Sequence, residues 1–400
     1  MIYNFLKYKN MEVILMKRYK YLLVLMLSIL CILSCIFTVF ADEAKPYKIG
    51  AILEVTGGLS FLGQPAKNTF KMVVDEINKN GGINGHSLEL VIYDTEGQPT
   101  RAVTFAQKLI KKDKVCAILG PLSSGSALAM IPIIEKAKIP NIALGASRKI
   151  VDPPKKWVFS TVQTDINTIS RMYKYMQNVA GINKLAIITA TDGFGDSGRE
   201  QLIKLAPNYG IKIVADEKFN SKDSDMTAQL TSIKRTSAQA IVCWTVGPSE
   251  AIVTKNWKQL AINVPLYQSH GAASKSFLET AGEQAEGVIF PAPKLIVADQ
   301  LPESDPQKKI LMKYKENYEG RFNQSVSKFG GNAHDAIRIM AEALKEVGEN
   351  PILIRDYIEK IHDYLGVVGN YNYTSEDHCG LSPDYFVMVQ VKNGNWKLLE

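Results

Sequence analysis

The stretch from Val115 to Leu144, VCAILGPLSSGSALAMIPIIEKAKIPNIAL, contains one complete strand, helix and strand pattern. It opens with a short β-rich apolar run, and residues 126–138 then show the 3.6-residue periodicity of a helix with one apolar face. Residues 140–144 form a second apolar run. Such a unit places two parallel strands in one sheet with a helix crossing between them. This stretch therefore predicts an α/β fold.

The same alternation continues on both sides of this unit. Before it, strands are expected at 47–53 and 88–94, with helices at 65–80 and 100–113. After it, a second series of expected strands lies at residues 184–190, 212–219, 240–246, 264–269 and 287–292. Two such series predict two lobes, each a doubly wound parallel sheet covered by helices.

The C-terminal part of the chain departs from the alternation. Helices are expected in succession at 306–319, 333–347 and 352–361. The segment 384–400 then reads as a hairpin whose turn is Asn393-Gly394, a strong two-residue turn signal. The return to helices predicts that the chain crosses back to complete the first lobe.

Composition excludes several classes of protein. A chain of 400 residues exceeds what one compact core usually holds, and its 46% hydrophobic content is that of an ordinary globular protein. The net charge is +7, of which the first 41 residues contribute five basic and one acidic residue, leaving 7 − 4 = +3 for the rest. No basic stripe with interleaved aromatic residues is present, so nucleic-acid binding is not expected.

The N-terminus has the features of an export signal. Residues 16–20, MKRYK, precede an uncharged apolar run at 21–41, and a polar segment follows. We expect a signal peptide at 1–41 that is cleaved after Ala41. Lipidation at Cys35 is one alternative, and an uncleaved anchor is another, because the run is long enough to span a bilayer. All three place the bulk of the chain outside the cytoplasm.

Six loops follow the expected strands at the edge where parallel sheets bind ligands. In the first lobe, the loops at 56–63, 120–126 and 144–149 offer hydroxyls and glycines at helix starts and no acidic residue. That chemistry suits an anion, although Ser124 and Ser147 could instead cap their helices. The second lobe contributes the loops at residues 191–198, 244–250 and 268–274.

No catalytic or cofactor motif stands out. The sequence GFGDSG at 193–198 matches a dinucleotide-binding pattern, but two residues separate it from the strand and the chain is expected to be exported. The five histidines lack the spacing of metal ligands. We therefore expect no enzyme activity, no cofactor and no metal, and turnover of a bound ester or amide would contradict this.

The motifs together resemble a known family. Residues 48–110, which include DEINKNGGINGHSLELVIYD, resemble the opening of the type I periplasmic solute-binding proteins of branched-chain amino-acid ABC transporters. The resemblance continues through AILGPLSSGSALAM, IPNIALGAS, ATDGFGDSG and AGEQAEGV to the closing hairpin. It implies two lobes joined by a three-crossover hinge that close on a ligand. The implied lobes are residues 42–164 with 292–377, and 165–291 with 378–400.

The resemblance also implies positions for ligand contacts. The family serine that holds a ligand carboxylate falls on Ser124, and the small residues beside it fall on Gly145, Ala146 and Ser147. An aromatic contact, often tyrosine in amino-acid binders, falls on Phe194, and a second tyrosine position falls near Val246 or Gly247. Leu62 and Trp244, in or beside these loops, complete the expected contacts.

The position that carries an acid in branched-chain amino-acid binders falls on His270. A buried ammonium without that acid would lose about 2–5 kcal/mol of binding free energy. The expected ligand is therefore a small carboxylate without a free α-amino group, with an aromatic ring as one option. Two alternatives remain open: Asp192 could supply the missing charge to an amino acid, and His270 could orient the lobes without touching ligand.

The resemblance implies an extracytoplasmic solute-binding component of an ABC importer. Its expected partners are the small ligand and a membrane permease, and the protein is expected to be a monomer. A ligand-sensing ectodomain built on the same fold is the alternative class of function.

Overall fold

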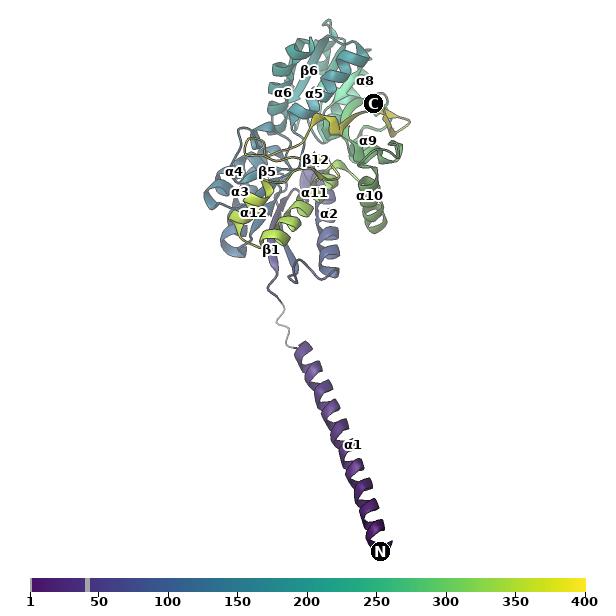
Figure 1. Cartoon of the computed structure of the whole chain (residues 1–400). Helices are drawn as coiled ribbons and strands as arrows, with labels where there is room; N and C mark the ends of the chain where they lie inside the picture. The colour runs from purple at the N-terminus through teal and green to yellow at the C-terminus, as the bar shows by residue number, and fades with distance from the viewer. Residues whose placement is uncertain (1, 40–43) are drawn as a thin grey trace. The chain divides into compact units, whose positions relative to one another are not determined.

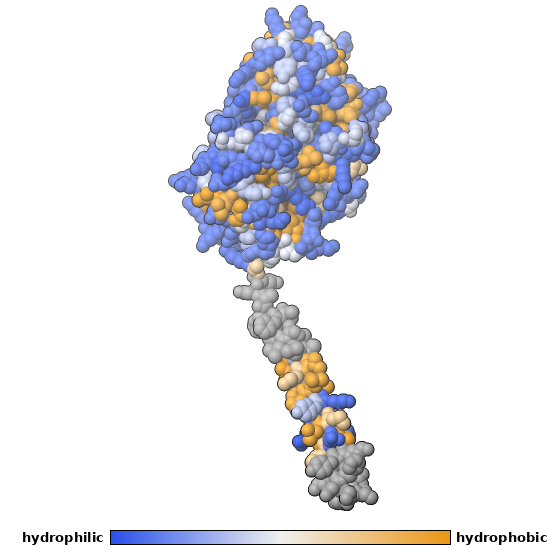
Figure 2. All heavy atoms as spheres, in the orientation of Figure 1, coloured by the Kyte–Doolittle hydropathy of each residue, from blue (hydrophilic) through white to orange (hydrophobic). Residues whose placement is uncertain are grey.

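The computed structural model describes residues 2–39 and 44–400, which divide into two compact units, Met1–Lys45 and Pro46–Glu400. The first unit contains helix α1 (Ile2–Val39), whose described side chains from Met11 to Ile29 expose many large hydrophobic groups (Figure 2). Within the described residues, no helix combines the length and the apolar character that crossing a membrane requires. Ala41 and the side chain of Cys35 lie outside the described residues.

The second unit contains a five-stranded parallel sheet in the order β2-β1-β3-β4-β5. The sequence predicted four of these strands and missed the fifth, which follows β4 after residues 144–157, a segment that contains a 3-10 helix at Arg148–Ile150. Because β1 lies second in this order, the sheet is wound in both directions from β1, as expected for a doubly wound lobe. Its strands are β1 (Tyr47–Leu53), β2 (Leu88–Asp94), β3 (Ala117–Leu119), β4 (Asn141–Ala143) and β5 (Val158–Ser160).

A seven-stranded sheet has the order β14-β13-β10-β9-β8-β6-β7. Five strands are parallel, and the predicted C-terminal hairpin adds the last two in antiparallel pairing. Its strands are β6 (Lys184–Ala190), β7 (Lys212–Phe219), β8 (Ala240–Trp244), β9 (Leu266–Gln268), β10 (Ile289–Pro293), β13 (Phe386–Lys392) and β14 (Asn395–Leu398). A third sheet pairs β11 (Tyr364–Leu365) with β12 (Asn370–Tyr371).

Helices cover the two larger sheets, as the alternating pattern predicted. In Figure 1, α5, α6 and β6 gather in one part of this unit, whereas β1, α2, α11 and α12 gather in the other. The helices are α2 (Ser60–Lys79), α3 (Pro99–Lys108), α4 (Ser124–Ala137), α5 (Asp165–Tyr175), α6 (Gly193–Leu205), α7 (Thr227–Lys234), α8 (Pro248–Gln259), α9 (Lys275–Ala281), α10 (Lys308–Phe322), α11 (Lys328–Val347) and α12 (Pro351–Ile358).

Two helices begin five residues earlier than the sequence predicted. Helix α2 begins at Ser60 and contains Pro65, whereas the sequence predicts Pro65 as its first residue. The added turn fits because a Cβ on Gly63 would collide with the backbone of Glu54, so only glycine allows this close approach. Helix α11 begins at Lys328, not at residue 333, because Ser327 caps it by accepting a hydrogen bond from Gly330 N–H.

The C-terminal helices return to the first sheet. Helix α11 packs against α2, and Arg338 pairs with Glu76 at 2.6 Å between these helices. Residues of α11 and α12 share one apolar cluster with the first sheet, whereas a second cluster lies around β8, β9 and β10. The chain thus passes between the sheets after β5, after β10 and before β13. The lobe boundaries given above remain a prediction.

Candidate ligand-binding site

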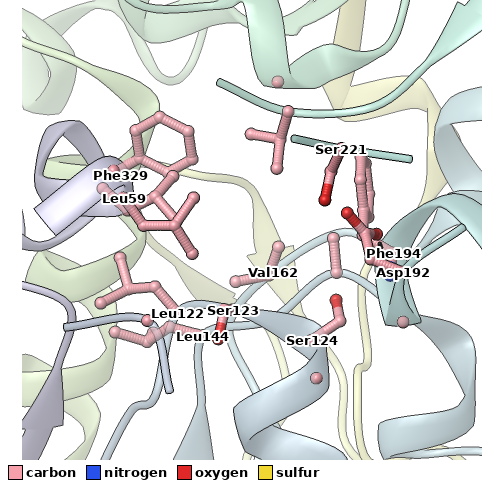
Figure 3. A pocket seen from close by; sticks show the side chains of 18 of the residues that line it. Leu59, Leu122, Ser123, Ser124, Leu144, Val162, Asp192, Phe194, Ser221 and Phe329 are labelled. Atoms are coloured by element: carbon pink, nitrogen blue, oxygen red, sulfur yellow. Dashed lines mark hydrogen bonds between the residues drawn. The ribbon is translucent and has the colours of Figure 1, made fainter. Parts of the chain in front are cut away.

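A cavity of about 480 Å³ lies at the carboxyl ends of strands from both large sheets. Its wall combines the starts of helices α4, α6 and α11 with loops from each sheet. Figure 3 shows Leu59, Leu122 and Phe329 on one side, Asp192 and Phe194 on the other, and Ser124 beneath them. The cavity is thus largely apolar, with a few polar groups at fixed places, which is the usual character of a small-molecule site.

The start of α4 supplies the first polar group. Ser123 caps the helix, because its hydroxyl accepts a hydrogen bond from Ser126 N–H at 3.4 Å. Ser124 is therefore not the cap, and its Oγ instead accepts a hydrogen bond from Ser147 N–H at 3.2 Å. The N–H groups of Ser124 and Gly125 lie in the first helical turn, where a helix offers no acceptor of its own. These groups are placed to bind an anion.

A buried acid that sequence reasoning missed lies behind this loop. The carboxylate of Glu54 accepts hydrogen bonds from Leu122 N–H at 3.0 Å, from Ser123 N–H at 3.2 Å and from the Ser123 hydroxyl at 2.8 Å. Burial raises its pKa, and these bonds act in the opposite direction. Glu54 thus fixes the loop and leaves Ser124 and Gly125 for a ligand. The sequence feature that could have identified Glu54 is its position directly after an apolar strand.

Of the small residues at 145–147, one lines the cavity wall and the other two lie behind it. Ala146 lines the cavity, but Gly145 and Ser147 do not. A Cβ on Gly145 would lie 2.8 Å from Ile150 Cδ1 and 3.2 Å from Ser124 Cα, so Gly145 faces packed protein. The Ser147 hydroxyl is buried and finds no hydrogen-bond partner among the described residues. Ser147 acts on the site through its N–H bond to Ser124.

The start of α6 forms the facing wall and includes Asp192 and Phe194. Asp192 Oδ1 caps this helix by accepting hydrogen bonds from Phe194 N–H at 3.0 Å and Gly195 N–H at 2.9 Å. A Cβ on Gly193 would lie 3.1 Å from Gly125 N, which shows how closely the starts of α4 and α6 approach. The glycines of the GFGDSG motif therefore serve packing.

His270 lies in the cavity wall and is only 1% exposed. Three rings surround it, with centroid distances of 5.5 Å to Phe194, 5.7 Å to Trp244 and 6.0 Å to Phe386. Both of its ring nitrogens are buried without a hydrogen-bond partner among the described residues. Burial lowers its pKa well below the usual range, and the nearby charge of Lys328 adds to this. His270 is therefore neutral at pH 7.

The remaining predicted residues lie in three different places. Leu62 lines the cavity. Trp244 is fully buried behind Phe194 and His270, and it does not reach the cavity. Gly247 lines a second cavity of about 220 Å³, whereas its neighbour Val246 lines the first. Trp244 is the last residue of its strand, and its side chain points toward α6, where a Cβ on Gly198 would meet the indole ring.

Helix α11 contributes residues that sequence reasoning missed: Lys328, Phe329 and Asn332 line the cavity. Lys328 is 5% exposed, and its ammonium lies over the ring of Phe329 at 4.9 Å from the centroid. Burial lowers the pKa of Lys328 to about 7, opposed by the charge of Glu250. Burial raises the pKa of Glu250 to about 8. Because the sequence placed the start of this helix five residues later, it gave no reason to examine Lys328.

The described part of the chain holds no group of three or more His, Cys, Asp or Glu side chains that could bind a metal ion. The cavity offers an anion site at Ser124, apolar walls and the nitrogens of His270 and Lys328, and the charged residues Glu96, Asp192 and Lys222 also line it. Such an arrangement can bind an organic anion by hydrogen bonds and burial of apolar surface.

Comparison with known proteins identifies the family of this chain. Residues 46–395 match the family model described as periplasmic binding protein. The leucine-, isoleucine-, valine-, threonine- and alanine-binding protein of Pseudomonas aeruginosa is 24% identical over 78% of this chain and 82% of its own length. An extracellular ligand-binding receptor from Rhodopseudomonas palustris superposes with a TM-score of 0.82 at 25% identity, covering 88% of this chain and 99% of its own.

A solute-binding protein of an ABC transporter from R. palustris, solved in complex with benzoate, shares the fold with a TM-score of 0.75 at 18% identity, over 88% of this chain and 95% of its own. The fold thus occurs both in an amino-acid-binding protein and in one that holds an aromatic carboxylate. Membership of the matched family implies an exported protein. The chain belongs to the periplasmic binding protein family, as a type I member of the branched-chain amino-acid group.

Proposed function

We propose that the protein binds a small carboxylate without a free α-amino group and delivers it, unchanged, to the membrane permease of an ABC importer. The observation that carries this proposal is neutral His270, buried in the cavity wall at the position where the resemblance implies an acid. A ligand ammonium at this place would find no negative charge on His270. An oxygen acceptor would find a ring nitrogen that now has no partner among the described residues.

The cavity binds the carboxylate end of the ligand at the start of a helix, which is a common kind of anion site. Ser124 offers its hydroxyl, and the first turn of α4 offers N–H groups and the positive end of the helix dipole. Hydrogen bonds to a charged group contribute about 1.5–3 kcal/mol each. Leu62, Leu122 and Phe329 line the space between and suit an aliphatic or aromatic body.

Amino-acid binding is the second candidate, because the Pseudomonas relative is named for it. In this chain the charge for an ammonium would have to come from Asp192, which lines the cavity. One oxygen of that carboxylate already accepts two backbone N–H groups at the start of α6. Because Asp192 already caps α6, this residue is less available to a ligand ammonium, which favours a carboxylate ligand over an amino acid.

We also propose that the protein is exported and that it closes on its ligand. Residues 1–41 act as the signal, with cleavage after Ala41 or lipid attachment at Cys35, and the mature protein is a monomer. Ligand binds one lobe first, and closure is favoured by the contacts that it gains from the second lobe. Delivery to a permease fits the family better than sensing, which the same fold could also support.

A ligand panel tests the proposal. The chain from Asp42, which contains the compact unit Pro46–Glu400, is expected to show a higher melting temperature with small carboxylates and not with leucine, valine or polar amino acids. A ligand at about 100 times its Kd adds about 2.7 kcal/mol of stability, enough to shift the midpoint by several degrees. A large shift with leucine or valine would reject this assignment and favour Asp192 as the ammonium partner.

A further inference from the structure

Lys328 is a buried lysine that faces the cavity without a counter-ion in contact. It lines the cavity at 5% exposure, and its ammonium has no hydrogen bond or ion pair within the described residues. Its ammonium lies over the face of the Phe329 ring, which contributes a cation–π contact. A buried ammonium is costly unless an acceptor or an anion faces it. The structure therefore leaves a place for such a group.

The nearest acid does not fill this place. Glu250 is close enough for its charge to act on Lys328, but the two lie farther apart than the 4.0 Å of an ion pair. The carboxylate of Glu250 is held elsewhere, since it accepts hydrogen bonds from the Ser269 hydroxyl at 3.2 Å and from Gly247 N–H at 3.3 Å. It also lines the second cavity and not the first.

His270 lines the same cavity as Lys328. The charge of Lys328 also disfavours protonation of His270. They come from different sheets: His270 follows β9, whereas α11 packs on the first sheet. An acceptor placed between them would satisfy an orphan ring nitrogen and a buried ammonium together.

We propose that Lys328 and His270 form a second anion subsite, so that the preferred ligand is a small dicarboxylate with an apolar body. This rests on the proposed function, because Ser124 and the start of α4 are taken to bind the first carboxylate. A second negative group supplies what Lys328 lacks, whereas a cationic group would be repelled there. The apolar residues of the wall would contact the hydrocarbon between the two carboxylates.

Pairs of dicarboxylates and monocarboxylates with the same kind of hydrocarbon body distinguish the second anion subsite from the proposed function alone. Isothermal titration calorimetry compares adipate with hexanoate, and terephthalate with benzoate, on the protein from Asp42. Each dicarboxylate is expected to bind at least 10-fold more tightly than its monocarboxylate partner. If monocarboxylates bind and dicarboxylates bind no better, the second subsite is rejected and the proposed function stands. If no carboxylate binds at millimolar concentration, both are rejected.

Substitutions of Lys328 test whether this residue binds the second carboxylate. Lys328→Met keeps an apolar stem and is expected to weaken dicarboxylate binding at least 30-fold while changing monocarboxylate binding less than 3-fold. Lys328→Arg retains the charge and is expected to keep the preference for dicarboxylates. Lys212→Met, which removes an exposed lysine at the start of β7 outside the cavity wall, controls for net charge and is expected to have no effect.

The remaining outcomes contradict the proposal. An equal loss of both acid classes in Lys328→Met would show that Lys328 supports the wall or holds the single carboxylate. Undiminished dicarboxylate binding would show that the ammonium does not reach ligand. Loss of folding in Lys328→Met, measured by chemical denaturation, would assign the buried Lys328 side chain a structural role. Loss of the dicarboxylate preference in a folded Lys328→Arg would contradict the proposal equally.

Discussion

Ser147 N–H donates a hydrogen bond to Ser124 Oγ at 3.2 Å and thereby joins two loops of the first sheet beneath the cavity. This bond occupies one lone pair of the Ser124 oxygen and leaves the hydroxyl proton free to be donated. The two loops that the sequence marked as anion sites thus act through one hydroxyl.

Ser124→Ala is expected to weaken carboxylate binding about 10- to 100-fold, because one charge-assisted hydrogen bond contributes about 1.5–3 kcal/mol. Titration calorimetry with the best ligand of the panel measures this. Ser126→Ala is the matched control, since the Ser126 hydroxyl lies in the same helical turn but is buried without a partner among the described residues. Equal effects of the two changes would show that Ser124 acts only through helix packing.

His270→Phe is expected to raise stability and lower affinity. The surrounding rings of Phe194, Trp244 and Phe386 suit an apolar ring, and the change removes two buried nitrogens that lack partners. We expect a gain of about 1 kcal/mol in the free energy of unfolding and a loss of at least 10-fold in carboxylate affinity. Urea denaturation and calorimetry measure the two quantities. Unchanged affinity would assign His270 a packing role.

Dicarboxylate binding is expected to depend on pH through Lys328. Its pKa in the free protein is about 7, and a ligand carboxylate beside it would raise that value, so binding takes up a proton above pH 7. Affinity should then fall as pH rises from 7 to 9, by up to about 10-fold per unit. Ionisation of Glu250, whose pKa is about 8, acts in the same direction by repelling the ligand.

His270 does not titrate in this range, because burial holds its pKa well below the usual value. Calorimetry in two buffers with different ionisation heats measures the proton uptake directly. Monocarboxylates, which do not reach Lys328, should show a flat profile over the same range and serve as the control. A flat profile for dicarboxylates would contradict the assigned role of Lys328.

The sequence predicted most of the fold, and physical reasons explain what it missed. Strands such as β1 and β6 are apolar and uninterrupted, and their periodicity alone locates them. In contrast, only a 3-10 helix at Arg148–Ile150 separates β5 from β4, so no helical period marks β5 as the next strand of the alternation. The early start of α2 was hidden by Pro65, which usually marks a first turn and here lies inside the helix.

The sequence predicted those cavity residues whose place in a loop after a strand puts them in the wall. It did not predict which side chains reach the cavity where this depends on the direction of the side chain. Ser124 and His270 follow strands at the expected edge, and both line the cavity. Trp244 ends a strand at the same edge, but its ring packs against α6 behind Phe194 and does not reach the cavity. Lys328 belongs to a helix that follows the second sheet in sequence and packs on the first, so no local pattern links it to the cavity.

Glu54→Gln is expected to destabilise the protein by about 1–3 kcal/mol. Leu122 N–H bonds to one carboxylate oxygen of Glu54, whereas Ser123 N–H bonds to the other. An amide side chain offers one acceptor only, so one backbone N–H would face an NH₂ group. Urea denaturation measures the loss, and carboxylate affinity should fall with it because the loop presents Ser124. Full stability would show that the loop relaxes onto another acceptor.

Gly193→Val is expected to weaken ligand binding at least 10-fold with little change in the stability of each lobe. A Cβ at this position would lie 3.1 Å from Gly125 N and 3.2 Å from Gly125 Cα, so a branched side chain would push the starts of α4 and α6 apart. Both helices present cavity residues, and a ligand that needs both walls would lose contacts to one of them. Gly320→Ala, an exposed helical glycine with nothing within 4 Å of its added Cβ, is the control. Calorimetry gives the affinity, and small-angle X-ray scattering with saturating ligand should show a larger radius of gyration for Gly193→Val than for the control. Equal radii and equal affinities would show that ligand binds without the close approach of these two helices.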